Sequence, residues 1–125
     1  MYQISKHSFN RLDMLNERLK SKAISIQPST KKTKKIDILI NGKVIASVGD
    51  INSMDYGLHL ERNGKDYADR RRASFYNRFK RLPDIKDNKI TNMFWARLLL
   101  WCWKSHHTPR FYYITTTIYN YLLTL

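Results

Sequence analysis

The sequence predicts an α+β fold in which a leading helix is followed by a small antiparallel β-meander and two helices packed on one face of the sheet. Three observations indicate this order. Apolar residues recur every three or four positions near the start of the chain, two β-branched runs flank an Asn-Gly pair, and helical periodicity returns further along. With 125 residues, of which 42% are hydrophobic, the chain is expected to form one folded domain.

The first predicted helix runs from about Ser8 to Ser21. Its apolar stripe consists of Phe9, Leu12, Leu15 and Leu19. Ser8 is the expected N-cap, although Arg11 stands where a capping box would carry an acidic residue. The opposite face is basic and carries Arg11, Arg18, Lys20 and Lys22.

Three short strands are expected after this helix, with a basic turn from Ser29 to Lys35 between the first two. The predicted strands are Ala23–Gln27, Ile36–Ile40 and Lys43–Val48. Asn41-Gly42 is the strongest signal in this region, because both residues of a two-residue hairpin turn must accept a positive φ. The three segments together predict an antiparallel meander.

Two more helices are expected beyond a loop that runs from Gly49 to Gly64. The second predicted helix spans about Asp66 to Leu82 and is stopped by Pro83. Its apolar stripe consists of Ala68, Phe75, Phe79 and Leu82. The third predicted helix, about Thr91 to Lys104, is apolar almost all round and is therefore expected to be the central buried element.

The sequence predicts two parts, a single α+β domain of residues 1–104 and an apolar C-terminal extension of residues 105–125. The segment Phe111–Leu125 carries no charge, and Thr115–Thr117 with the neighbouring aromatic residues favours a strand over a helix. Three roles remain open for it: a strand added to a sheet edge, an ordered arm on a partner, or an aggregation-prone end.

Positive charge is the most informative feature of the composition. Lys and Arg number 23 against 10 Asp and Glu, which gives a formal net charge of +13. Much of the excess is clustered in Lys31–Lys35 and Arg70–Arg72. Like charges held close together repel each other and destabilise the folded state, so clusters of this kind indicate a polyanionic partner. A solvated loop is the alternative for the first cluster. The three arginines point in three directions on a helix and cannot all contact one ligand, and Arg72 is expected to pair with Asp69 or with an acidic residue elsewhere.

No pattern in the chain predicts catalysis, a cofactor or a metal site. Cys102 is the only cysteine, which excludes an internal disulfide and a Cys-based zinc cluster, and we expect it to be buried. His59 is interpreted as a structural loop histidine, because no spacing or nucleophile completes a catalytic set with the acids around it. The pair His106-His107 is expected at a solvated helix end, and the tryptophans Trp95, Trp101 and Trp103 in the core.

The sequence also predicts an intracellular protein that has no membrane contact and is not secreted. Met1–His7 lacks the apolar region of a signal peptide. The most hydrophobic stretch, Met93–Trp103, contains Arg97 and is too short for a hydrocarbon core of about 30 Å. A single cysteine is typical of a reducing compartment.

An ordered series of short motifs resembles one known family. The motifs are Ile26–Lys35, Asn41–Lys43 with Val48-Gly49, Asp55–His59, Tyr76–Arg78 and Phe94–Trp101. The series is similar to small, basic, functionally uncharacterised proteins encoded by nucleocytoplasmic large DNA viruses of algae and protists. Two positions depart from that family's pattern: Val48-Gly49 replaces Phe-Gly, and Arg78-Phe79 replaces Arg-His. Residues after Trp101 also differ from the family's short, proline-containing ending.

The resemblance implies a viral setting, in the virion or in the cytoplasm or nucleus of an infected cell, without an established activity. Our first hypothesis is a non-enzymatic protein that binds nucleic acid through phosphates without reading sequence. The predicted contact residues are Lys31, Lys32, Lys34, Lys35, Lys43, Arg70, Arg71, Arg78 and Arg81. The alternative is a minor capsid or virion structural protein that docks on acidic capsid proteins and contacts a partner through its C-terminal extension. A nuclease-like enzyme is the third and most distant possibility.

Overall fold

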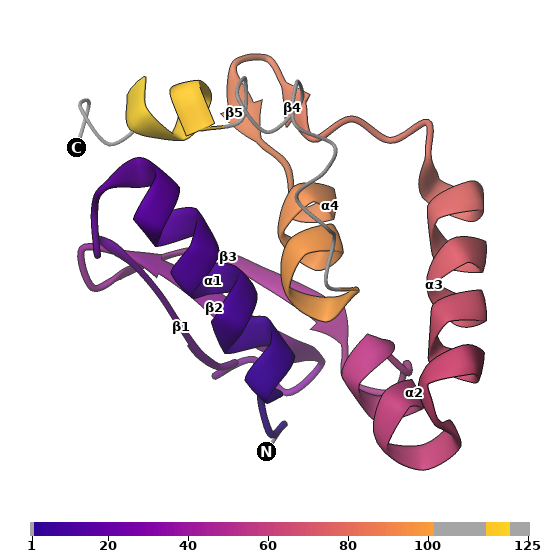
Figure 1. The fold of residues 1–125 in the computed structure, drawn as a ribbon. Coiled ribbons are helices and arrows are strands. Elements are labelled where there is room, and N and C mark those ends of the chain that lie inside the picture. The colour runs from indigo at the N-terminus through magenta and orange to yellow at the C-terminus, as the bar shows by residue number, and fades with distance from the viewer. Residues whose placement is uncertain (1, 102–114, 121–125) are drawn as a thin grey trace.

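The computed structural model describes residues 2–101 and 115–120 and confirms the α+β fold (Figure 1). A three-stranded antiparallel sheet is covered by helix α1 (Lys6–Leu19) and by a short helix, α4 (Asn92–Trp95), that comes much later in the chain. Helices α2 (Tyr56–Asn63) and α3 (Lys65–Phe79) stand beside the sheet, at the end where its third strand leaves it. Of the two helices predicted to pack on the sheet, the third predicted helix does so, whereas the second, which corresponds to α3, packs against α2 instead. The core joins side chains from α1, the sheet and the segment around α4 in one cluster.

Helix α1 (Lys6–Leu19) begins earlier than the sequence predicts. Ser5 is the N-cap, and its Oγ accepts a hydrogen bond from the backbone N of Ser8 at 3.2 Å. The prediction that Ser8 caps the helix is therefore wrong. Ser8 is buried within the helix, where its hydroxyl donates to the backbone carbonyl of Leu99 and so ties α1 to the segment around α4. The predicted stripe holds in part, since Leu12, Leu15 and Leu19 are buried whereas Phe9 is exposed.

The sheet has the order β1-β2-β3, with β1 (Ile24–Pro28), β2 (Lys34–Ile40) and β3 (Lys43–Asp50). Asn41 and Gly42 form the predicted two-residue turn, and their φ angles of 52° and 81° lie in the left-handed region that this turn requires. The hairpin and the meander are both confirmed. Strand β2 is central, and five of its seven residues are buried.

Helix α2 (Tyr56–Asn63) occupies part of the segment that was expected to be a loop, so that expectation is wrong. Asp55 is its N-cap, with Oδ1 accepting from the backbone N of Leu58 at 3.0 Å. The helix is short and contains Gly57, so it carries too few residues for a recognisable helical period.

Helix α3 (Lys65–Phe79) follows almost at once and ends earlier than the predicted boundary at Leu82. The Arg97 guanidinium donates to the backbone carbonyls of Phe79 and Leu82 at 2.8 and 2.7 Å and also pairs with Asp84. Arg97 is 4% exposed, so this buried cation fixes the end of α3 against the core.

A small hairpin, β4 (Ile85–Lys86) and β5 (Lys89–Ile90), leads into the buried helical segment. Helix α4 (Asn92–Trp95) starts at the N-cap Thr91 and continues as the π-helical turn η1 (Ala96–Leu100). The expected buried element is therefore present, and Phe94, Leu98 and Leu99 are at most 1% exposed. Its backbone differs from a regular α-helix, which the apolar pattern does not reveal.

Residues 115–120 are helical, so the prediction of a strand over Thr115–Thr117 is wrong. Ile118 is 1% exposed and belongs to the main core cluster. Packing of an apolar side chain thus outweighs the β-propensity of the threonines. The predictions for Cys102, Trp103, the helix end at Lys104, His106-His107 and the rest of the extension lie outside the described residues, and the division at residue 104 stays a prediction.

No helix within residues 2–101 or 115–120 combines the length and apolar character needed to cross a membrane.

Candidate nucleic-acid interface

The basic turn between β1 and β2 is held by backbone hydrogen bonds. The N–H of Ser29 donates to the carbonyl of Lys35 at 3.0 Å, and the N–H of Lys34 donates to the carbonyl of Lys31 at 3.2 Å. Thr33 accepts from the N–H of Ile51 at 3.0 Å, which links the turn to the residue that follows β3. Lys31 and Lys32 are exposed on the turn, and Lys34, the first residue of β2, is half-buried where the turn ends.

A buried carboxylate anchors this turn from inside the sheet. Burial alone would raise the pKa of Asp37, but hydrogen bonds from Ser29, Ser47 and Thr30 outweigh it and lower the pKa to about 2. The hydroxyls of Ser29 and Ser47 donate to Asp37 Oδ1 at 2.6 and 2.7 Å. Asp37 is therefore ionised at neutral pH and stabilises the base of the turn.

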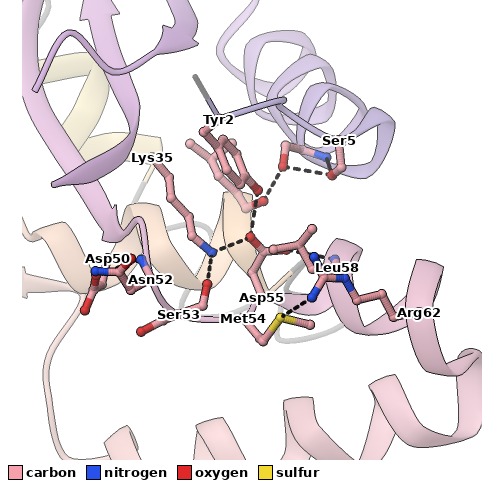
Figure 2. A network of polar contacts seen from close by, with 12 residues as sticks. Tyr2, Ser5, Lys35, Asp50, Asn52, Ser53, Met54, Asp55, Leu58 and Arg62 are labelled. Atoms are coloured by element: carbon pink, nitrogen blue, oxygen red, sulfur yellow. Dashed lines mark hydrogen bonds and ion pairs between the residues drawn. The ribbon is translucent and has the colours of Figure 1, made fainter. Parts of the chain in front are cut away.

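Lys35 is not part of this exposed set, which corrects its prediction as a phosphate contact. Its side chain is 1% exposed, and Nζ lies 2.7 Å from Asp55 Oδ2, which is also buried. Asp55 Oδ2 accepts a second hydrogen bond from the Tyr2 hydroxyl at 2.7 Å, and Lys35 Nζ also donates to the carbonyl of Ser53. Figure 2 shows Asp55 between Lys35, which reaches from the sheet, and Tyr2. A side chain with these partners is withdrawn from any ligand on the surface.

The three consecutive arginines of α3 diverge, as the helical spacing predicts. Arg72 pairs with Asp69 at 3.2 Å, as expected, and its guanidinium lies 4.3 Å from the centre of the Tyr56 ring. Arg70 lies 5.9 Å from the ring centre of Tyr67. Arg71 instead lines a cleft.

This cleft, of about 630 Å³, lies between the end of β3, α2, α3 and η1. On α3 it is lined by residues one turn apart on one face: Arg71, Ser74, Phe75 and Arg78. An apolar wall completes it, formed by Met54, Phe79, Met93, Ala96, Leu100 and Trp101. Lys35, Asp50, Ser53, Asp55, Gly49 and His59 line the remainder. The cleft was not predicted from the sequence, although the spacing of Arg71 and Arg78 marks their common face.

His59 is a wall residue of the cleft and lies in α2, so the expectation of a loop histidine is wrong. It is 5% exposed, and its ring is 5.4 Å from that of Tyr67 and 6.0 Å from that of Trp101. Burial lowers the pKa of His59, and the positive charge of Arg71 lowers it further, so the imidazole is neutral at pH 7. Its Nδ1 is buried and has no hydrogen-bond partner among the described residues.

The structure brings one subset of the predicted contact residues together. Lys34 pairs in register with Asp50 at the end of β3, and Asp50 lines the cleft. The turn lysines and the cleft arginines Arg71 and Arg78 therefore share one end of the sheet. Lys43 lies at the opposite end, beside the Asn41-Gly42 turn. Arg70 and Arg81 are exposed but do not line the cleft.

The arrangement is suited to holding an anion. Within the described parts of the chain, no cluster of three His, Cys, Asp or Glu residues could hold a metal ion. Comparisons with protein-family models, curated proteins and solved structures found no match.

Proposed function

We propose that this chain is a non-enzymatic protein that binds nucleic acid through its phosphates without reading sequence. The supporting residues are Lys31, Lys32 and Lys34 on the basic turn together with Arg71 and Arg78 on α3. A net charge of +13 supplies the long-range attraction to a polyanion. These five cations lie at the same end of the sheet, and this shared position is the main support for the proposal.

The availability of these cations supports the proposal. No ion pair joins any of the five to a carboxylate within the described residues, whereas Lys35, Arg72 and Arg97 each have such a partner. Cations that are already paired inside a protein gain little from a phosphate, while exposed ones gain by releasing the counterions of the nucleic acid. Of the predicted contact residues, Lys43, Arg70 and Arg81 contribute to the overall charge without joining this surface.

The viral setting rests on the resemblance of the ordered motifs in Ile26–Trp101. In that setting the protein would act on the nucleic acid of a large DNA virus, inside the virion or the infected cell. This part of the proposal is tested by proteomics of fractionated virions and infected cells.

Salt-dependent binding to duplex DNA tests the proposed function. The triple variant Lys31→Gln, Lys32→Gln, Lys34→Gln should weaken binding equally for unrelated sequences. It should also reduce the salt slope by about 0.9 for each phosphate that the variant no longer neutralises. The matched control is Lys43→Gln, Lys86→Gln, Lys89→Gln, which removes the same charge from exposed positions outside this surface. The control should change affinity less.

Three results would contradict the proposal or the surface assigned to it. Absence of duplex binding by the unmodified protein at low salt would exclude it, and binding to acidic proteins alone would favour the capsid-docking alternative. Equal weakening in the two triple variants would show that the total charge, rather than this surface, governs binding.

A further inference from the structure

We propose that the cleft between α2, α3 and η1 accepts one unpaired nucleotide, with its base against the apolar wall and its phosphate on Arg71 and Arg78. This inference rests on the proposed function and adds a preference for single-stranded over duplex nucleic acid. Three features of the cleft support it. The cleft has an aromatic wall, and it has two arginines that form no ion pair with a carboxylate of the described residues. It is also lined by His59, whose buried Nδ1 has no hydrogen-bond partner among the described residues.

The wall provides a rigid apolar surface for a base. Phe75 is half-buried and stacks on Trp101, with ring centroids 4.5 Å apart and an interplanar angle of 16°. Phe79 lies beside it, 4.9 Å from Phe75 between ring centroids. A volume of about 630 Å³ falls in the range of small-molecule pockets. Aromatic surfaces of this kind stack bases of any sequence, which agrees with binding that does not read sequence.

The two arginines provide the anion contact. Arg71 and Arg78 are two turns apart on α3 and stand on either side of Phe75 along the same helix face. Neither forms an ion pair with a carboxylate in the described part of the chain. Asp55, the buried acid of the cleft, is already neutralised by Lys35, which leaves Asp50 as the one lining carboxylate without an ion pair among the described residues. A guanidinium binds phosphate oxygens in a bidentate manner, so a phosphodiester suits this pair.

His59 provides a neutral polar side chain beside the aromatic ring of Trp101 in the lining of the cleft. The unpartnered Nδ1 belongs to a residue that is only 5% exposed, and a buried polar atom without a partner is unfavourable. A neutral imidazole has one donor and one acceptor, and the edge of a base presents groups of both kinds. Because His59 lines the cleft, a base there would lie beside the residue whose nitrogen lacks a partner in the described part of the protein.

The geometry favours an unpaired base over a paired one. Bases in a duplex are stacked and hydrogen-bonded to each other, so they can enter a protein cleft only after they are unpaired. A duplex would therefore contact the lysine turn and the arginines through its backbone, and only a single strand would also occupy the wall. A free nucleotide offers the same chemistry from a second source.

The test compares two double variants of α3 and its C-terminal end that remove the same charge. Arg71→Gln, Arg78→Gln changes the cleft, and Arg70→Gln, Arg81→Gln changes exposed arginines that do not line it. Binding of a labelled short single-stranded DNA of mixed sequence and of the matching duplex is measured by fluorescence anisotropy. The cleft variant should lose about tenfold in affinity for the single strand and clearly less for the duplex. The duplex loses phosphate contacts alone, whereas the single strand also loses the contact that holds its base against the wall. The control should weaken both substrates in equal proportion.

A second variant tests stacking without a change in charge. Phe75→Leu keeps an apolar side chain of similar size and should weaken single-strand binding alone, because duplex binding does not use the wall. Competition by dAMP identifies the source of the nucleotide: displacement of the oligonucleotide at micromolar dAMP assigns the cleft to free nucleotides, and displacement only at far higher concentration assigns it to a strand.

Equal affinity for single strand and duplex, weakened equally by both double variants, would overturn the cleft proposal and leave the proposed function intact. Binding of dAMP without binding of any nucleic acid would support the cleft as a nucleotide site and overturn the proposed function. Absence of both would exclude both proposals.

Discussion

The two ends of the three-stranded sheet each contain a glycine with a positive φ, and the two glycines are there for different reasons. Gly42 has a φ of 81°, and a Cβ added to it would meet nothing within 4 Å. Gly49 has a φ of 84°, and a Cβ there would lie 2.8 Å from Leu100 Cδ1 and 3.2 Å from Lys35 Cβ. The first glycine satisfies a local turn, whereas the second lets the cleft end of the sheet pack against η1.

The hairpin end is therefore determined by neighbouring residues, and the cleft end by residues far apart in the chain. Lys35 and Leu100 meet beside Gly49, and Lys35 also pairs with Asp55, although long segments separate Lys35 from both residues. Substitutions at the cleft end should accordingly cost more than substitutions at the hairpin end.

The largest effect is expected from Lys35→Met, which leaves Asp55 buried without its cation. Removing one partner of a buried ion pair typically destabilises a protein by about 3–5 kcal/mol. Urea unfolding measures the free energy of unfolding, and Lys34→Met is the matched control because it removes the same charge from a half-buried neighbour without an ion pair among the described residues. Equal effects of the two substitutions would show that the pair with Asp55 contributes little.

Gly49→Ala is expected to have the next largest effect, about 2–4 kcal/mol, because it combines backbone strain with overpacking against Leu100. Gly64→Ala separates the two causes. Gly64 has the same φ of 84° but open space around it, so this control carries the strain alone. The difference between the destabilisation by Gly49→Ala and that by Gly64→Ala gives the cost of overpacking where β3 approaches η1. A difference of zero would show that this close approach contributes nothing to stability.

At the hairpin end, Gly42→Val should destabilise the fold by about 1–3 kcal/mol, since a β-branched side chain would be forced to a positive φ. Gly42→Asn is the control, because asparagine tolerates this conformation. Thermal unfolding compares the two variants. An unchanged melting temperature for the valine variant would mean that the turn does not require the left-handed conformation.

The smallest expected effect is a dependence of stability on pH through His59. Its pKa in the folded protein is lowered from 6.5 by burial and by Arg71, with Lys35 acting in the same direction and Asp55 against it. The unfolded chain therefore binds more protons below about pH 6.5, so the free energy of unfolding should fall as the pH drops below that value and be insensitive to His59 above it. His59→Gln should flatten this part of the profile, and an identical slope in the variant would contradict the assignment.

The predictability of the fold follows the same division between local and distant causes. The leading helix and the Asn41-Gly42 hairpin were predictable, because a helical period and a turn dipeptide lie within a few residues of the structure they specify. The cap of α1 was misplaced by one turn, since Ser5 and Ser8 offer the same hydroxyl and only the contact of Ser8 with Leu99 distinguishes them.

The candidate site was predictable only in part. The exposed lysines of the turn and the divergence of Arg70–Arg72 follow from residue type and helix geometry. Lys35 looks like its neighbours in a lysine cluster, and its burial depends on Asp55, twenty positions along the chain. Asp55 in turn has two structural roles, since its Oδ1 caps α2 and its Oδ2 pairs with Lys35. The cleft depends on the packing of α2, α3 and η1, which no local pattern specifies.

The π-helical turn η1 confines the extra residue of this helical segment to one point. The N–H of Trp101 bonds to the carbonyl of Ala96, five residues back, at 3.1 Å, so the turn holds one residue more than an α-helix would. Deleting a single residue between Ala96 and Leu100 would let the Trp101 N–H reach the same carbonyl with ordinary α-helical spacing, and Trp101 would keep its place against Phe75. A deletion in the regular turn before Ala96 would instead rotate Trp101 by roughly 100° about the helix axis and away from Phe75. The wall of the cleft therefore tolerates the loss of a residue within η1 but not the loss of one before it.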